Sequence, residues 1–138
     1  MEIIYKHISE LTYEEILEIY NLRQQVFMLE QKIYVEDIDQ YDYDSYHCYI
    51  KINNKIVSYL RVIKKDDEVF IGRLLTVKSE RKKGLAKLLV NFVKNKYDVI
   101  KVSSQVNVIS FYKELGFKEI KNRYKEAGIF HQLMIYIK

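Results

Sequence analysis

The chain has no proline and no tryptophan, and its 138 residues include one cysteine and four glycines. The single cysteine, Cys48, excludes an internal disulfide and favours a reducing compartment, so we expect a cytoplasmic protein. No apolar run approaches the length needed to span a bilayer. The first fifteen residues mix acidic with apolar side chains and lack the basic-then-apolar order of a secretion signal. We therefore expect neither export nor a membrane partner.

Several well-known site motifs are also missing. The sequence contains neither the Gly-Lys-Ser/Thr of a Walker P-loop nor a G-x-G-x-x-G dinucleotide fingerprint. The three histidines and Cys48 have no ligand spacing such as H-x-x-x-H or C-x-x-C, so we expect no metal. His47 precedes Cys48, but adjacent residues of a strand point to opposite faces, which argues against a Cys-His nucleophile.

The composition is that of a globular protein, with 49% hydrophobic and 30% charged residues. A chain of this length can bury its own core, so residues 1–138 are interpreted as a single domain. The net charge is +4, which could attract nucleic acid, a membrane surface or an anionic small molecule. Acidic residues concentrate before Glu68 and lysine clusters follow it, so the charge is unevenly distributed.

The apolar pattern predicts an α/β fold with a mixed, mostly antiparallel sheet and helices on its faces. Thr12 and Glu15 have the spacing of a capping box at the start of a helix, and "NNK" is typical of a hairpin turn. The strand, turn and helix at 69–97, followed by a strand at 99, form a βαβ crossover. Strands are expected at 3–8, 47–52, 55–63, 69–77, 98–104, 117–124 and 131–137, and helices at 12–27, 84–97 and 107–115.

A basic turn precedes the second helix, where Arg81, Lys82 and Lys83 are followed by Gly84. A helix N-terminus presents unpaired N–H groups and the positive end of the helix dipole, and a glycine allows close backbone approach. This combination suits a pyrophosphate. Three cations in a solvated turn are the alternative explanation from spacing alone.

Two motifs carry a resemblance to a known family. R-x-x-G-x-A at 81–86 resembles the acyl-CoA signature of the GNAT superfamily of N-acetyltransferases, and "NVISFYKELGF" resembles its N-x-x-A-x-x-F-Y-x-x-x-G-F segment. Six ordered blocks are similar to the ElaA-type branch: "LRQQVFMLEQ", "EDIDQYD", "YLRVI", "IGRLLTV", "SSQVNVISFYKELGF" and "YKEAGIFHQLM". The chain departs from that branch at 32–35, Ala127 and Phe130, which puts the acceptor substrate in doubt.

The resemblance implies a GNAT fold that transfers acetyl from acetyl-CoA to a primary amine of a small molecule or protein. The amine would attack directly in a ternary complex. In the family, backbone amides of the turn bind the pyrophosphate and the preceding strand pairs with the pantetheine. Carried over, the pyrophosphate residues are Arg81, Lys82, Lys83, Gly84, Leu85 and Ala86, and the pantetheine residues are Leu75, Thr76 and Val77.

Tyr112 matches the family tyrosine that donates a proton to the CoA thiolate, and a phenol is a reasonable donor since its pKa lies near that of a thiol. Without the resemblance, one tyrosine among 13 would be interpreted as a core ring. Asn107 is expected to cap its helix, with a cofactor contact as the alternative.

The acceptor side is less defined. Many members of the family use a glutamate on the strand before the turn as the general base, and Ile71 occupies about that position here. Glu68 lies nearby but is expected at the beginning of the strand. Arg61 and Arg73 interrupt apolar strands and should pair with Glu30 or Asp39 or bind an acidic substrate group. The candidates for acceptor binding or proton removal are Glu30, Asp39, His47 and His131. Arg73 is a further candidate for binding the acceptor, and each of the five has a purely structural alternative.

Two other functions remain open from the sequence. The cations at 81–83, Lys94, Lys96 and Lys101 would also suit a basic nucleic-acid-binding module, although we do not favour nucleic acid as a partner. A GNAT fold that binds CoA without catalysis is the other alternative. The use of other acyl-CoAs and a homodimeric state are left open as well.

Overall fold

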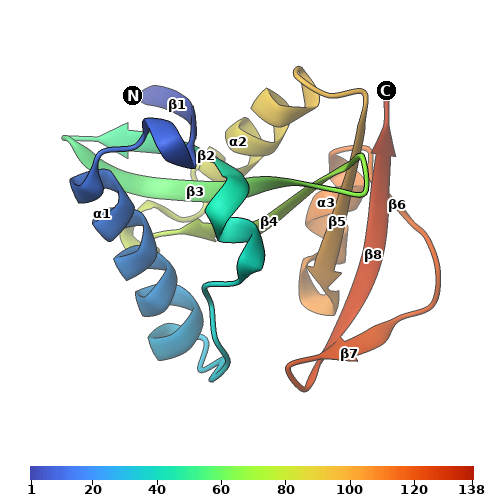
Figure 1. The fold of residues 1–138 in the computed structure, drawn as a ribbon. Helices are drawn as coiled ribbons and strands as arrows, with labels where there is room; N and C mark the ends of the chain where they lie inside the picture. Colours follow the sequence, from blue (N-terminus) through green and yellow to red (C-terminus); the bar gives the residue numbers. More distant parts are fainter.

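A twisted sheet of eight strands runs through the molecule (Figure 1). The structure is a computed structural model that describes residues 1–138. The strand order is β1-β2-β3-β4-β5-β8-β6, and β7 pairs with β8. Every pair is antiparallel except β4 with β5, as predicted. The strands are β1 (Glu2–His7), β2 (Ser45–Ile52), β3 (Lys55–Lys65), β4 (Glu68–Thr76), β5 (Val99–Gln105), β6 (Lys118–Glu119), β7 (Tyr124–Glu126) and β8 (Ile129–Ile137).

Three tight hairpins connect neighbouring strands. Their turns are 53–54, 66–67 and 127–128, and both residues of each turn have positive φ. Paired positive φ values are those of type I′ turns, whose twist matches that of the strands. The hairpin predicted at "NNK" is confirmed.

The helices are α1 (Tyr13–Arg23), α2 (Leu85–Lys94) and α3 (Ile109–Glu114). The Thr12 side chain accepts from the Glu15 N–H and Glu15 accepts from the Thr12 N–H, so the predicted capping box is confirmed. The helix expected over 12–27 is regular only to Arg23, and a π-helical segment, η2 (Gln24–Glu30), continues it. Short 3₁₀ turns are η1 (Ile8–Glu10), η3 (Gln40–Asp44), η4 (Lys78–Glu80) and η5 (Val106–Val108). None of the helices combines the length and apolarity that crossing a membrane requires.

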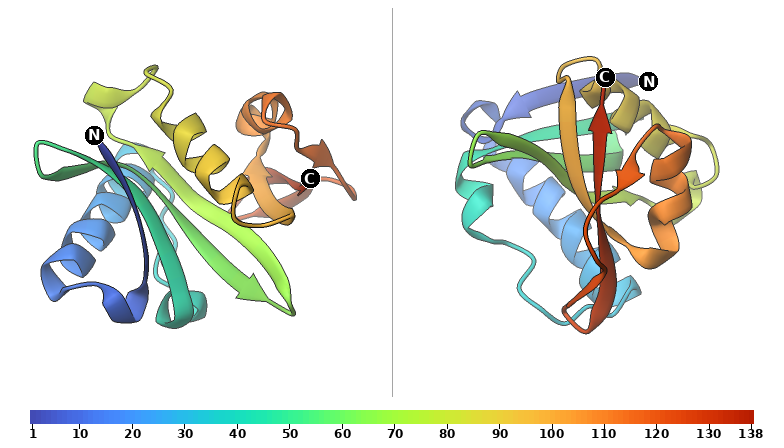
Figure 2. Two further views of the ribbon diagram at one scale, coloured as in Figure 1. Left: turned by 90° about the horizontal axis from the view of Figure 1, so that it is seen from above. Right: turned by 90° about the vertical axis from the view of Figure 1, so that its right-hand side faces the viewer.

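The sheet buries a separate core on each face, and Figure 2 shows α1 and α2 on opposite sides of it. Cys48 and Leu60 pack with α2 and α3, while Tyr49 and Tyr59 pack with α1. His47 hydrogen-bonds Tyr59 on the α1 face, so it points away from the Cys48 side. The predicted separation of His47 from Cys48 is confirmed.

The crossover from β4 through α2 to β5 is parallel, as predicted, but its pairing is short. Only Phe70 with Lys101 and Ile71 with Val102 are in register. Beyond them β4 shifts register against β3, and Arg73 adopts φ 53° there, which is unusual for a residue other than glycine. β4 and β5 then separate, which leaves one edge of β4 open.

Two predictions were wrong. The strand expected at 117–124 forms only over the two residues of β6, because the next residues bend away and the Gln132 amide binds the carbonyls of Ile120 and Lys121, each at 3.0 Å. Asn107 does not cap α3, because it lies inside η5 and Val108 occupies the N-cap position without a side-chain hydrogen bond.

Candidate active site

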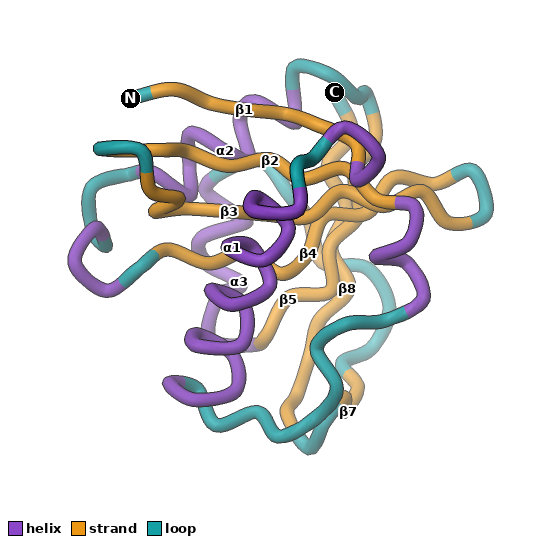
Figure 3. The backbone as a smooth tube through the Cα atoms, turned by 60° about the vertical axis from the view of Figure 1, so that its left-hand side comes forward, coloured by secondary structure: helices purple, strands orange, loops and turns teal.

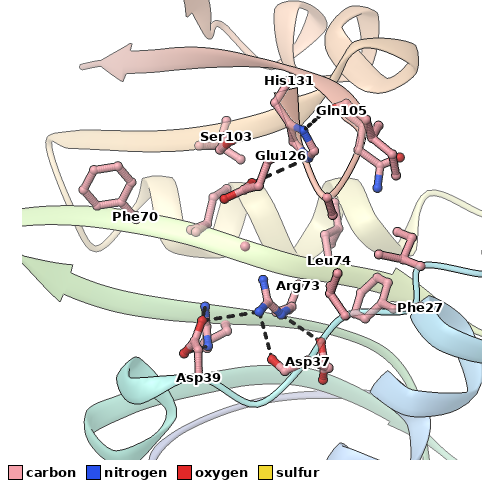
Figure 4. Close-up of a pocket in the computed structure, with 18 of the residues that line it drawn as sticks. Phe27, Asp37, Asp39, Phe70, Arg73, Leu74, Ser103, Gln105, Glu126 and His131 are labelled. Carbon is pink, nitrogen blue, oxygen red and sulfur yellow. Dashed lines mark hydrogen bonds and ion pairs between the residues drawn. The ribbon is translucent and has the colours of Figure 1, made fainter. Parts of the chain in front are cut away.

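A cleft of about 750 Å³ opens where β4 and β5 separate (Figure 4). Residues of the loop between η2 and η3 contribute to its lining. Figure 3 shows the course of the chain through its loops, which are drawn in teal. Tyr112 also lines it, from α3. The lining residues labelled in Figure 4 are Phe27, Asp37, Asp39, Phe70, Arg73, Leu74, Ser103, Gln105, Glu126 and His131.

Ion pairs line one wall of the cleft. Arg73 Nε lies 2.8 Å from Asp37 Oδ1, and its Nη2 donates to the Asp37 carbonyl at 2.8 Å and to Asp39 at 3.3 Å. Arg61 binds both carboxylate oxygens of Asp39 at 2.8 and 3.1 Å. The expected pairing of Arg61 and Arg73 with Asp39 is confirmed. These contacts hold the Arg73 side chain against the loop between η2 and η3.

A buried arginine completes this network behind the wall. Arg23 is fully buried and donates to Asp37 and Asp42, both at 2.7 Å. Burial alone would raise the pKa of Asp42, but the hydrogen bond and charge of Arg23 outweigh it and hold that pKa well below its usual value. Asp42 therefore stays ionised, and three arginines face three aspartates.

The opposite wall carries His131 and Glu126, which face Arg73 across the cleft (Figure 4). His131 Nδ1 lies 2.8 Å from the Ile129 carbonyl oxygen, and Nε2 lies 3.8 Å from Glu126 Oε2. The Tyr124 ring stacks on the imidazole with centroids 6.0 Å apart. Register places Tyr124 of β7 and Gln105 of β5 on either side of His131. The Ile129 carbonyl and the Tyr124 ring therefore fix the position of the imidazole.

Tyr112 lies at the cleft with its ring buried between Phe111 and Phe117, at centroid distances of 5.1 and 5.4 Å. Burial raises the pKa of its hydroxyl, so the group stays protonated at neutral pH. The hydroxyl makes no hydrogen bond to another residue of the chain. A buried phenol without a partner is free to donate its proton into the cleft.

The basic turn has the backbone geometry of an anion site. Gly84 is the N-cap of α2 with φ 80°, no side chain caps this helix, and no acidic residue occupies its first turn. The N–H groups of Lys82, Lys83 and Gly84 find no acceptor in the chain. A Cβ at Gly84 would meet no protein atom within 4 Å, so the space above the turn is open.

Arg81 does not point freely from this turn. Its Nε donates to the Thr76 carbonyl at 2.8 Å, and its Nη1 and Nη2 bind both oxygens of Glu30 at 2.5 and 2.8 Å. The guanidinium therefore joins the end of η2 to the end of β4. We call this arrangement the Arg81 clamp.

The open edge of β4 leads from the turn to the cleft. The Val77 N–H donates to the Val57 carbonyl of β3 at 2.9 Å, so the backbone of Thr76 faces the opposite, open edge. By the same alternation Leu74 faces that edge and Leu75 faces β3. Of the three residues expected to pair with pantetheine, only Thr76 presents its backbone to the open edge.

The cleft brings together four of the predicted site residues, Asp39, Arg73, Tyr112 and His131. Glu30 lies outside it, in the Arg81 clamp. His47 is fully buried away from it, between Ser45 Oγ at 2.8 Å and Tyr59 Oη at 2.6 Å. Its position argues against a contact with the acceptor.

The remaining predicted residues also lie outside the cleft lining, at the end of β4 and in the turn and start of α2, except Asn107, which lies in η5. Leu75 and Leu85 are buried in the cores, which leaves only their backbone for a ligand. Glu68 begins β4, as expected, and pairs with Lys101, while Ile71 lines the cleft. No three His, Cys, Asp or Glu side chains gather closely enough to hold a metal ion.

Sequence reasoning missed Asp37, Glu126, Ser103 and Tyr124, all of which line the cleft. All four lie inside the blocks that resemble the ElaA-type branch, and this resemblance was the signal that could have identified them. Their partners are distant in sequence or depend on the hairpin register, so spacing alone does not reveal them.

The comparisons with known proteins agree with this geometry. An acetyltransferase (GNAT) domain model matches residues 8–138. A UPF0039 protein of Schizosaccharomyces pombe is 33% identical, over 95% of this chain and 93% of its own, and the ElaA protein of Escherichia coli is 32% identical, over 91% and 89%.

Solved structures give the same answer. The crystal structure of Escherichia coli ElaA superposes with a TM-score of 0.89 over 98% of each chain, at 27% identity. An acyl-CoA N-acyltransferase of Pseudomonas aeruginosa shares the fold, with a TM-score of 0.90 over 99% of each chain at 24% identity. The predicted fold and the resemblance to ElaA are confirmed, and the chain belongs to the GNAT acetyltransferase family.

Proposed function

We propose that this protein transfers the acetyl group of acetyl-CoA to a primary amine of a small molecule or protein, by direct attack in a ternary complex. The observation that carries the proposal is the continuous path from the unpaired amides at Gly84, along the open edge of β4, to a cleft lined by Tyr112. The fold neighbour from Pseudomonas aeruginosa is itself described as an acyl-CoA N-acyltransferase.

The turn fits the pyrophosphate of a CoA thioester. Unpaired N–H groups and the positive end of the α2 dipole favour an anion there, and the Lys82 side chain adds charge without an ion-pair partner in the chain. The exposed Lys83 also pairs with Glu80 at 2.9 Å, so it contributes less. The backbone of Leu74 and the Thr76 N–H at the open edge would pair with the amides of the pantetheine arm, while the Thr76 carbonyl already accepts a hydrogen bond from Arg81 Nε. In this proposal Arg81 shapes the turn rather than binding phosphate directly.

The chemistry requires an activated acyl group, which the acetyl-CoA thioester supplies. Tyr112 gives its hydroxyl proton to the sulfur as the C–S bond breaks. A protonated, unpartnered hydroxyl suits that role. Asp39, Arg73 and His131 face the acceptor amine, because they line the part of the cleft beyond the edge of β4.

The first test is acetyl-CoA binding, measured as a thermal shift. Saturating acetyl-CoA should raise the melting temperature by roughly 5 to 10 °C, because it binds only the folded chain. Gly84→Val should abolish the shift, since its side chain would fill the space above the turn. Gly128→Val is the matched control, because Gly128 also has a positive φ of 75° and open surroundings but lies in the β7–β8 turn.

Thiol release with a panel of monoamines, polyamines, amino acids and lysine peptides then tests catalysis. Absence of a thermal shift at millimolar acetyl-CoA would contradict the proposal. A shift without turnover on any amine would favour a CoA-binding protein without catalysis. Salt-dependent binding to DNA or RNA in place of a shift would favour the nucleic-acid module.

A further inference from the structure

The cleft must also contain a group that takes a proton from the acceptor, since an amine reacts only after it loses its charge. Three of the four groups considered from the sequence are already engaged. Glu30 is bound in the Arg81 clamp, and Asp39 holds Arg61 and Arg73. His47 has both ring nitrogens in hydrogen bonds and no exposed surface.

His131 is the fourth, and its geometry fixes its tautomer. A carbonyl oxygen can only accept a hydrogen bond, so the 2.8 Å contact with Ile129 requires the proton on Nδ1. In the neutral ring Nε2 then carries the lone pair. Nε2 makes no hydrogen bond within the chain, and His131 lines the cleft opposite Arg73 (Figure 4). The ring therefore presents a basic nitrogen to the cleft.

Glu126 is placed to support this nitrogen. Its Oε2 lies 3.8 Å from Nε2, and its side chain is 65% exposed to solvent. A carboxylate at this distance stabilises the ring once Nε2 gains a proton. Tyr124 is the other titratable group that packs against the His131 ring. The residue that pairs with His131 on β5 is Gln105, which is neutral.

We propose that His131, through Nε2, is the base that takes a proton from the acceptor ammonium, and that Glu126 is a positioning residue for it. The inference rests on the proposed function. The N–H bond of the ammonium breaks, its electron pair stays on nitrogen, and the proton moves to Nε2. That pair forms the new C–N bond with the acetyl carbon. After the C–N bond forms, the nitrogen loses a second proton. This proton replaces the one that Tyr112 gives to the sulfur of CoA, so the step balances.

His131→Asn tests this role. The asparagine amide can still donate to the Ile129 carbonyl, but it offers no basic nitrogen in place of Nε2. We expect kcat, with the best amine of the panel, to fall by about 10² to 10⁴ while the acetyl-CoA thermal shift stays unchanged. In the wild type log kcat should fall at acidic pH and level off above. In the variant it should keep rising with pH, because solvent must deprotonate the amine.

Two further variants sharpen the test. His7→Asn makes the same change at a histidine on the surface outside the cleft and should keep the wild-type rate. Glu126→Gln keeps the size of the side chain and removes the negative charge that lies 3.8 Å from Nε2. We expect kcat to fall several-fold with little change in KM or in the acetyl-CoA thermal shift. A wild-type kcat in this variant would overturn the positioning role of Glu126.

Nitrogen-15 NMR of the imidazole gives a readout that needs no acceptor. We expect the neutral His131 ring with its proton on Nδ1. The opposite tautomer, or a His131→Asn variant with wild-type kcat and acid limb, would overturn the base assignment alone. A wild-type protein that acetylates no amine of the panel would instead overturn the proposed function, and the base with it.

Discussion

At the scale of single residues, the sharpest expectation concerns the hydroxyl of Tyr112. Tyr112→Phe removes this group and keeps the ring between Phe111 and Phe117. The hydroxyl has no hydrogen-bond partner in the chain, so the fold should tolerate its loss. If it protonates the departing sulfur, kcat should fall by about 10² or more with little change in acetyl-CoA affinity. Steady-state kinetics with the best amine of the panel would measure both.

The matched control for this variant is Tyr136→Phe. Tyr136 belongs to the same aromatic cluster, packed on Phe117 at 5.6 Å, but it does not line the cleft. Its kinetics should resemble those of the wild type. Wild-type turnover by Tyr112→Phe would contradict the acid assignment and leave the donor site unaffected.

At the scale of elements, the Arg81 clamp connects η2, which borders the cleft, to the turn before α2. Glu30 places a negative charge beside the proposed phosphate site and occupies the Arg81 guanidinium. Glu30→Gln removes that charge and frees Arg81. We expect acetyl-CoA to bind about 2- to 5-fold more tightly at low salt, with a smaller gain at high salt because ions screen exposed charges. Calorimetric titration at two salt concentrations would measure the effect.

Glu14→Gln provides the control for Glu30→Gln. Glu14 is an exposed acid in the first turn of α1, at the other end of the same helical segment, and it makes no ion pair. Glu14→Gln changes the net charge of the protein by the same amount as Glu30→Gln but leaves the turn before α2 unaltered. Weaker acetyl-CoA binding by Glu30→Gln would contradict this expectation. It would show that the Arg81 clamp shapes the turn for binding, and that losing the clamp costs more affinity than removing the Glu30 charge restores.

These elements also show what the sequence could and could not predict. The capping box at Thr12 and the "NNK" hairpin depend on neighbouring residues, so local patterns predicted both. The pairing of Arg73 with Asp37 depends on a bulge and on a loop 36 residues away. Glu126 meets His131 only through the register of β7 against β8. Contacts of this kind come from tertiary structure, so no local pattern could predict them.

At the scale of the whole molecule, buried charge joins the sheet to the rim of the cleft. Arg23 from α1, Arg61 from β3 and the aspartates at 37, 39 and 42 form one network, and His47 lies beside it. Burial, and then the nearby Arg23, lower the pKa of His47 to about 4. A cationic His47 would be repelled by Arg23 and Arg61, and Asp42 is the nearby charge that would stabilise it. The folded protein therefore holds this ring neutral.

This buried histidine predicts a loss of stability in mild acid. The unfolded chain protonates His47 near pH 6.5, whereas the folded chain does so only at about pH 4. Between these values the unfolded state binds the extra proton, so the free energy of unfolding should fall by roughly 3 kcal/mol as the pH drops. Urea titrations at pH 7, 6, 5 and 4 would measure the slope. His47→Gln should start less stable and lose most of this slope, whereas His7→Gln, at a partly exposed ring paired with Asp44, should keep it. An unchanged slope in His47→Gln would assign the acid sensitivity to other groups.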